Sequence, residues 1–246
     1  MVVGTSNTPD FPIVPTNAAV TADAAHELRT PLAAIQATAQ SDLMLPDLSG
    51  FQAKETLKSI VRQNKRLSYL VADLLTLCRI DGEKTIDASS RKREKVTLAN
   101  LIIEVEEDLL ALAMASEIEL ISQIKVSQPI EIMGDRQQLY RLITNLVTNA
   151  IQYTPVSGKV FISLTEEHHQ AVISVRDTGI GIARKDQKHI FDRFYRVDKA
   201  RSRSKGGSGL GLAIARAIAL AHKGSLEVQS EIGRGSNFLL RLPKNN

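Results

Sequence analysis

Two long segments near the N-terminus carry apolar residues at helical spacing. In residues 18–45 these positions recur at intervals of three, four and eight, which places them on one face of a helix. In residues 52–80 they alternate strictly by three and four, the spacing of the a and d positions of a coiled coil. The positions that form the two stripes are Ala24, Leu28, Leu32, Ile35, Ala39 and Leu43, then Ile60, Gln63, Leu67, Leu70, Leu74 and Leu77. Because Pro46, Ser49 and Gly50 separate the segments, the pattern predicts an antiparallel helical hairpin over residues 18–80.

A single hairpin offers too little surface to bury both apolar stripes. We therefore expect two copies of the chain to pair into a four-helix bundle, which makes the protein a homodimer. The alternative, in which the hairpin packs against the rest of its own chain, stays open at this point.

The pattern of polar and apolar residues changes after the hairpin. Residues 81–95 (DGEKTIDASSRKREK) are polar and charged and predict a linker. Residues 96–246 then alternate between helical and strand-like patterns. Helices are expected at about 99–116, 135–153 and 209–222, and strands at 118–126, 130–133, KVFISL, AVISVRD, SLEVQS and NFLLRL. The predicted fold class is α+β: a helical-hairpin domain followed by an α/β sandwich with helices on one face of a mixed sheet.

Composition narrows this picture. Aromatic residues make up only 4% of the chain and Trp is absent, so the core must be aliphatic. The lone cysteine, Cys78, has no partner for an internal disulfide, which fits a reducing cytosol. No apolar run approaches the roughly 18 to 20 residues of a membrane span. Residues 1–17 contain three prolines and no apolar core of a signal peptide, and they are expected to form a flexible leader.

Basic residues concentrate in one stretch. Residues 184–205 hold nine Lys and Arg residues against three Asp residues, which suits a polyanion, either a nucleic acid or a nucleoside triphosphate. A solvated surface loop is the alternative for the charges alone. DNA binding lacks a recognisable motif, and we expect no nucleic-acid partner.

One histidine, His26, has neighbours that suggest a role in a reaction. On the first predicted helix, His26 lies about 160° from the centre of the apolar stripe and therefore faces solvent. Glu27 is adjacent and Thr30 follows one turn later. A neighbouring carboxylate can accept the proton of one ring nitrogen and make the other nitrogen a better nucleophile.

Four further features suit a phosphate ligand. DTGIGI (177–182) follows a predicted strand and GGSGLGL (206–212) opens a predicted helix, and glycines let backbone approach a ligand closely. Asn145 and Asn149 share a helix face and could present amide oxygens to Mg²⁺. The basic stretch 191–201 lies between the two glycine motifs, as a lid would.

These motifs together resemble the sensor histidine kinases of two-component systems. HELRTPLAAI (26–35) resembles their H box, NLVTNAIQYT (145–154) the N box, DTGIGI the first glycine box, FDRFYR the F box and GGSGLGLAI (206–214) the second glycine box. All five occur in the family's order. The resemblance implies a dimeric phosphotransfer domain and an ATP-binding catalytic domain of the fold shared with gyrase and MutL. It also implies ATP and Mg²⁺ as cofactors and a response regulator receiver domain as partner.

The resemblance also assigns roles in phosphotransfer. His26 would take the γ-phosphoryl group of ATP and pass it to an Asp of the response regulator, with Glu27 as general base. Glu27 with Thr30 resembles the family's phosphatase motif. Arg196, helped by Lys199, would neutralise charge on the transferring group.

The nucleotide site follows in the same way. Asp177 would accept the adenine amino group, while Asn149 with Asn145 would hold Mg²⁺ and Tyr153 would line the phosphate side. The glycines would let the chain pass close to the base, hinge the lid and start the phosphate-binding helix. The remaining residues of this implied site are Gly179, Gly181, Gly207, Ser208, Gly209, Leu210 and Gly211.

The chain departs from the family pattern at two positions. Gln152 stands where many relatives carry Lys or Arg, so one charge that would neutralise phosphate is missing, and Ser208 replaces the commoner Thr. A gyrase-type ATPase would need a Glu in the N-box helix, where this chain has Asn145. A degenerate, non-catalytic module has only Gln152 in its favour. No sensory domain is visible before His26, so we expect a cytoplasmic chain or the soluble part of a membrane-anchored sensor.

Overall fold

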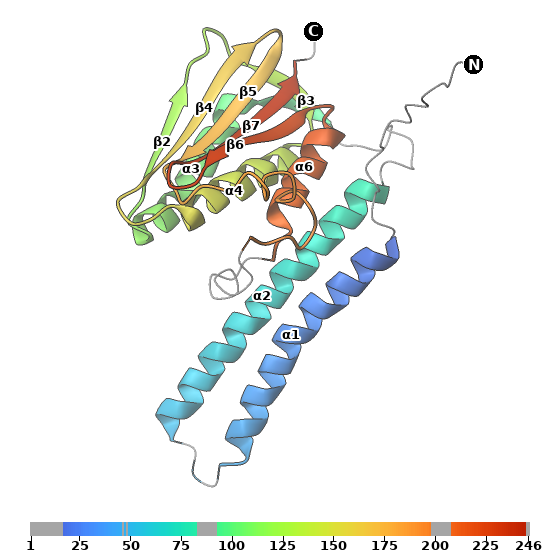
Figure 1. Cartoon of the computed structure of the whole chain (residues 1–246), viewed down its shortest axis with the longest axis vertical. Coiled ribbons are helices and arrows are strands. Elements are labelled where there is room, and N and C mark those ends of the chain that lie inside the picture. Colours follow the sequence, from blue (N-terminus) through green and yellow to red (C-terminus); the bar gives the residue numbers. More distant parts are fainter. Residues whose placement is uncertain (1–16, 46, 48, 83–92, 198–207, 245–246) are drawn as a thin grey trace, which may run out of the picture. The chain divides into compact units, whose positions relative to one another are not determined.

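The computed structural model describes residues 17–45, 47, 49–82, 93–197 and 208–244. Contacts divide the chain into two compact units, Met1–Leu67 and Ser68–Asn246. Figure 1 labels the helices and strands of both units.

The first unit contains the predicted helical hairpin. It is built from α1 (Asn17–Leu43) and the first half of α2 (Gly50–Gly82). A capping box starts α2: the Ser49 hydroxyl accepts from the Gln52 N–H at 3.2 Å, and the Gln52 side chain accepts from the Ser49 N–H at 3.2 Å. The hydroxyl of Thr56 donates to the carboxylate of Asp42, which joins the two helices side by side.

The second unit contains a five-stranded mixed sheet in the order β2-β4-β5-β7-β6. Only the β2–β4 pair in this sheet is parallel. A separate two-stranded antiparallel sheet pairs β1 with β3. The strands are β1 (Glu94–Thr97), β2 (Glu119–Ile124), β3 (Glu131–Gly134), β4 (Lys159–Glu167), β5 (Gln170–Asp177), β6 (Ser225–Glu231) and β7 (Gly235–Pro243).

Three helices pack beside this sheet and close the core (Figure 1). They are α3 (Leu98–Ala115), α4 (Arg136–Tyr153) and α6 (Gly211–Ala221). Each buries an apolar stripe, and alternate residues of β4 and β5 point into the same core. Among the described residues the buried core is aliphatic except for Phe238, as the composition predicts. The α+β architecture is therefore confirmed.

Strand β1 begins in the last two residues of the predicted linker, 81–95, and periodicity did not predict it. It begins at Glu94 and buries a single apolar side chain, Val96, opposite Ile132 of β3. Two exposed charged residues precede Val96, so the sequence of β1 resembles that of a solvated connection. Only its pairing with β3 identifies it as a strand. Residues 83–92 of the predicted linker lie outside the described residues. The domain boundaries at 17, 80 and 95 remain a prediction.

The start of α4 is held by side-chain contacts. The carboxylate of Asp135 accepts from the N–H groups of Gln137 and Gln138 at 2.9 and 3.1 Å, an N-cap. Nε2 of buried His222 accepts from the Asp135 N–H at 3.0 Å, so the ring proton sits on Nδ1, which faces the Ile218 carbonyl at 2.9 Å. The end of α6 thereby positions the beginning of α4. Within the part of the chain that the structure describes, no helix has the length and apolarity to cross a bilayer.

Candidate phosphoacceptor and nucleotide sites

The candidate phosphoacceptor lies on the surface of α1. The His26 ring is exposed, as the helical periodicity predicts, and Glu27 beside it is half-buried. The hydroxyl of Thr30 donates to the His26 carbonyl at 3.2 Å. The two residues are four apart on the helix, so their side chains lie on the same edge. A ring in this position is open to a reacting partner.

Asp177 ends β5 and is the most deeply buried carboxylate of the candidate site. It is 4% exposed, and its Oδ1 accepts from the N–H groups of Gly179 and Ser236 at 2.8 and 3.1 Å. Burial raises the pKa of this carboxyl, and the two backbone hydrogen bonds oppose that rise. No described residue donates a hydrogen bond to Oδ2. A buried carboxylate with one oxygen still able to accept suits a ligand that brings an N–H donor.

The first glycine turn packs closely on the end of α4. A Cβ at Gly179 would lie 2.6 Å from the carbonyl oxygen of Tyr153, which itself accepts from the Ile180 N–H at 3.2 Å. Gly181 has φ +70°, and a Cβ there would lie 2.0 Å from the Glu231 carbonyl oxygen. Only glycine lets the chain turn here, which places Asp177 beside the end of the N-box helix.

Asn145 and Asn149 are half-buried one turn apart on α4. The Asn145 amide donates to the Gly211 carbonyl at 3.1 Å, which leaves its Oδ1 as a possible ligand and connects α4 to the start of α6. The amide of Asn149 makes no hydrogen bond to another described residue. Amide oxygens fit Mg²⁺, which takes one or two protein ligands when phosphates complete its shell. The described residues contain no cluster of three or more His, Cys, Asp or Glu for a metal held by protein alone.

The second glycine box forms a turn in front of α6. Gly209 has φ +73°, and its carbonyl accepts from the Phe194 N–H at 3.0 Å, so this turn packs directly on the F box. The Ser208 hydroxyl accepts from the Leu210 N–H at 3.2 Å and donates to Asp73 of α2 at 3.0 Å. Leu210 is buried, and α6 begins at Gly211, two residues later than the pattern predicts.

The candidate lid is described only in part. Arg196 is half-buried at its described end, and the neighbouring Arg193 forms an ion pair with Asp81 at 2.5 Å. Lys199 and Gly207, both named from the sequence, lie outside the described residues. Their proposed roles remain predictions.

The sequence motifs did not predict a further set of residues around the first glycine turn. Ser236 holds Asp177, and Gln187 and Ser230 hold the chain just after the turn. Gly235 has φ +90°, and a Cβ there would lie 2.0 Å from the Asp177 carbonyl oxygen. The only sequence feature that could have indicated these contacts is GRGS (233–236) between two predicted strands, and it is typical of an ordinary hairpin turn.

Two family models match the chain in succession. The His Kinase A (phospho-acceptor) domain matches residues 16–83, which include exposed His26. The histidine kinase-, DNA gyrase B- and HSP90-like ATPase matches residues 134–246, which include Asp177 and both glycine boxes. The chain belongs to the sensor histidine kinases. The domain in its second half is of an ATP-binding type.

Individual histidine kinases agree with this assignment. Sensor histidine kinase RppB of Synechocystis is 43% identical over 223 residues, covering 91% of this chain and 48% of RppB. The solved structure of Acinetobacter baumannii histidine kinase AdeS is 26% identical with a TM-score of 0.70, covering 90% of this chain and 98% of that one. Histidine kinase ThkA, solved in complex with response regulator TrrA, shares the fold at 23% identity and a TM-score of 0.63, covering 92% of this chain and 61% of ThkA. The chain spans about half the length of RppB.

Proposed function

We propose that the chain is a protein-histidine kinase that phosphorylates its own His26 from ATP and passes the phosphoryl group to an Asp of a response regulator. The observation that carries the proposal is the pairing, in one chain, of an exposed histidine next to a glutamate on a helix with a buried carboxylate beside a glycine turn. ThkA, of the same fold, was solved with a response regulator, which supports that partner class.

The proposed reaction has two phosphoryl-transfer steps. One ring nitrogen of His26 forms the N–P bond while the bond from the γ-phosphorus to the bridging oxygen breaks, and ADP leaves with that electron pair. The proton of the other ring nitrogen passes to Glu27, and Arg196 neutralises charge on the transferring group. In the second step the N–P bond breaks as the receiver carboxylate forms the new O–P bond. Glu27 and Thr30 are also the residues that would orient water if the chain removes phosphate from its regulator.

Asp177 recognises the adenine base in this proposal. Its Oδ2 accepts from the amino group of the base, while Oδ1 keeps its two backbone donors. The first glycine turn passes close to the base, Tyr153 lines the phosphate side, and the start of α6 offers free N–H groups to phosphate. Because ATP is available in the cytoplasm, we expect the chain to act there.

Mg²⁺ is the proposed metal, held by Asn149 with Asn145. When bound it would neutralise charge on the nucleotide phosphates. The two side chains suit that task because they present oxygen without adding negative charge next to the phosphates.

Replacing Asn149 with Ala should remove the Mg²⁺ dependence of ATP binding. We expect the ratio of ATP Kd values in EDTA and in Mg²⁺ to fall about tenfold, because the amide oxygen that ligates the ion is lost. Isothermal titration of both variants measures the ratio. Asn149→Asp keeps an oxygen ligand and should retain most of the effect, whereas an unchanged ratio in Asn149→Ala would contradict this metal site.

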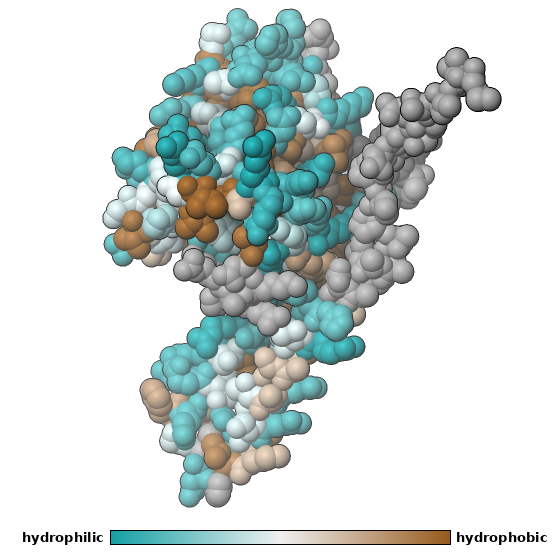
Figure 2. Space-filling view, in the orientation of Figure 1, coloured by the Kyte–Doolittle hydropathy of each residue, from teal (hydrophilic) through white to brown (hydrophobic). Residues whose placement is uncertain are grey.

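A homodimer is the proposed assembly. Leu57 and Val61 of α2 are 63% and 52% exposed and Leu32 of α1 is 47% exposed, although all three lie on helices with apolar stripes. Figure 2 shows apolar side chains left at the surface of the helical hairpin. Burial of each such side chain stabilises by about 1.5 to 3 kcal/mol, and a second hairpin supplies the covering surface.

A double variant, Leu57→Glu with Val61→Glu, should therefore separate the dimer. Two charges buried in the dimer interface should raise the dimer Kd by at least about a hundredfold. Sedimentation equilibrium gives the constant. Arg62→Glu lies about 100° further round the same helix and serves as the matched control, which should stay dimeric. A wild-type chain that sediments as a monomer throughout the micromolar range would rule out this assembly.

The direct test of the function is labelling. Incubation with γ-labelled ATP and Mg²⁺ should give a phosphoprotein that is labile in acid and stable in base, and adding the cognate receiver domain should move the label to it. Label that survives acid would contradict phosphohistidine.

A further inference from the structure

The turn that carries Asp177 is attached to the β6–β7 hairpin at several points. Besides the Ser236 N–H on Asp177, the Gly233 N–H donates to the Ile180 carbonyl at 2.8 Å. At Gly181 and Gly235 the two segments approach each other so closely that neither position has room for a side chain. The position of Asp177 therefore depends on how the hairpin holds the turn.

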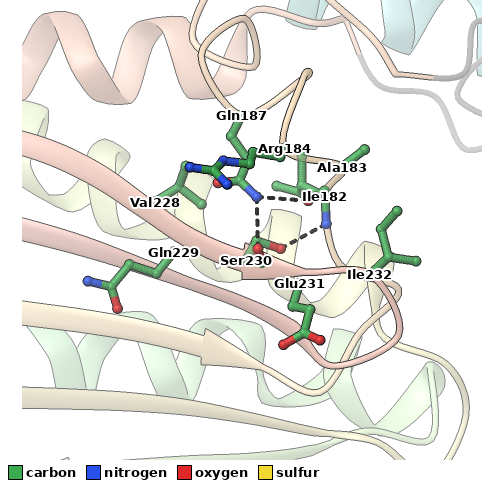
Figure 3. Close-up of a pocket in the computed structure, with 9 residues that line it drawn as sticks. All are labelled: Ile182, Ala183, Arg184, Gln187, Val228, Gln229, Ser230, Glu231 and Ile232. Carbon is green, nitrogen blue, oxygen red and sulfur yellow. Dashed lines mark hydrogen bonds between the residues drawn. The ribbon is translucent and has the colours of Figure 1, made fainter.

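Ser230 of β6 is the centre of this attachment (Figure 3). Its hydroxyl accepts from the Ile182 N–H at 2.8 Å, donates to the Gly235 carbonyl at 2.9 Å and contacts the Ser236 hydroxyl at 3.0 Å. A hydroxyl has one donor and two acceptor sites, so all of its capacity is used. One side chain thus joins the end of the glycine turn to the first residues of β7, one of which holds Asp177.

Gln187 completes the attachment from the other side. Its side-chain amide donates both protons, one to the Ile182 carbonyl at 2.9 Å and one to the Ser230 carbonyl at 2.8 Å. Both backbone polar groups of Ile182 are then fixed, the N–H by Ser230 and the carbonyl by Gln187. These contacts border an open depression of about 660 Å³ between residues 182–187 and 228–232 (Figure 3).

We propose that Ser230 and Gln187 are positioning residues that hold the glycine turn so that Asp177 can read the adenine amino group. The inference rests on the proposed function, since it concerns the nucleotide site of that kinase. Both act through the backbone of Ile182 and through Asp177. Their effect should therefore appear in adenine affinity and depend on the presence of the carboxylate.

The test measures nucleotide affinity of the full chain in two backgrounds. Ser230→Ala should weaken ATP binding about tenfold, the size of one net hydrogen bond lost. Ser230→Thr keeps the hydroxyl and should restore the affinity. In the Asp177→Asn background, Ser230→Ala should change the Kd by less than about twofold, because the contact that it positions is already lost. Inosine triphosphate lacks the adenine amino group. Ser230→Ala should therefore also change the Kd for inosine triphosphate by less than about twofold.

Matched variants separate positioning from general damage. Gln187→Glu keeps the shape but removes the two donors, and it should resemble Ser230→Ala. Gln229→Ala alters the neighbouring exposed residue of β6 and should leave the Kd unchanged. An equal loss for Ser230→Ala in both backgrounds, or a lowered melting temperature with normal ATP affinity, would overturn the inference. A wild-type chain that binds no ATP would overturn the proposed function as well, whereas normal binding by Ser230→Ala would overturn only the inference.

Discussion

A His26→Gln variant should incorporate no acid-labile phosphate from ATP. Glutamine preserves the helix and the polarity of the exposed surface, but its amide nitrogen is not nucleophilic towards phosphorus. We expect labelling to fall by at least about a hundredfold, to the level of a reaction without protein. Quantified autoradiography after neutral and acid washes measures the fall.

Nucleotide affinity should survive this change. Asp177 and the glycine turns belong to the second compact unit, and His26 to the first, so the ATP Kd of His26→Gln should match that of the wild type. His168→Gln is the matched control, because His168 is also exposed but lies in the β4–β5 turn. Label that persists without His26, or disappears equally in His168→Gln, would refute the phosphoacceptor assignment.

An Asp177→Asn variant should bind ATP about 10 to 100 times more weakly. The carboxylate Oδ2 that accepts from the base is replaced by an amide, which can turn a donor towards the adenine amino group. A hydrogen bond to a charged acceptor contributes about 1.5 to 3 kcal/mol, consistent with that range. Titration calorimetry gives the Kd, and the helical hairpin should stay dimeric. Glu167→Gln, an exposed carboxylate at the β4–β5 turn, is the control. Normal ATP affinity in Asp177→Asn would show that the adenine site lies elsewhere.

The same variant should be more stable than the wild type at neutral pH. Burial raises the pKa of Asp177 above its ordinary value of 3.8, so the folded state binds this proton more tightly than the unfolded chain. Stability contributed by the group is therefore fully present below pH 3.8 and is lost as the pH rises through the raised folded-state pKa. Asp177→Asn removes this cost, so its advantage in the free energy of unfolding should shrink as the pH falls through the raised folded-state pKa and should disappear below 3.8. Urea unfolding at several pH values follows the difference. A gap that widens in acid would contradict the direction of the shift.

Such a trade between stability and binding is expected at a functional carboxylate. The two backbone donors on Oδ1 stabilise the ion only in part, and a ligand donor on Oδ2 would complete its set of partners. ATP should therefore raise the melting temperature of the wild type more than that of Asp177→Asn.

Most of the fold could be predicted because its elements carry strong periodic signals. The seam of α2 and the apolar face of α4 repeat over many turns, so the helices were placed within two or three residues of their ends. Strand β1 could not, because four residues with one buried side chain contain no repeat. Its structure depends on β3, some 35 residues further along the chain.

The candidate site divides in the same way. The amino-acid sequence by itself determined the family and the exposed position of His26, and it predicted Asp177 as the acceptor carboxylate, because helical spacing and short glycine motifs are local properties of the chain. Only the tertiary structure decided that Ser230, Gln187 and Ser236 surround the turn that carries Asp177. They come from segments up to 59 residues away from it, and hydrogen bonds between strands that meet only on folding leave no periodic trace in the order of the residues.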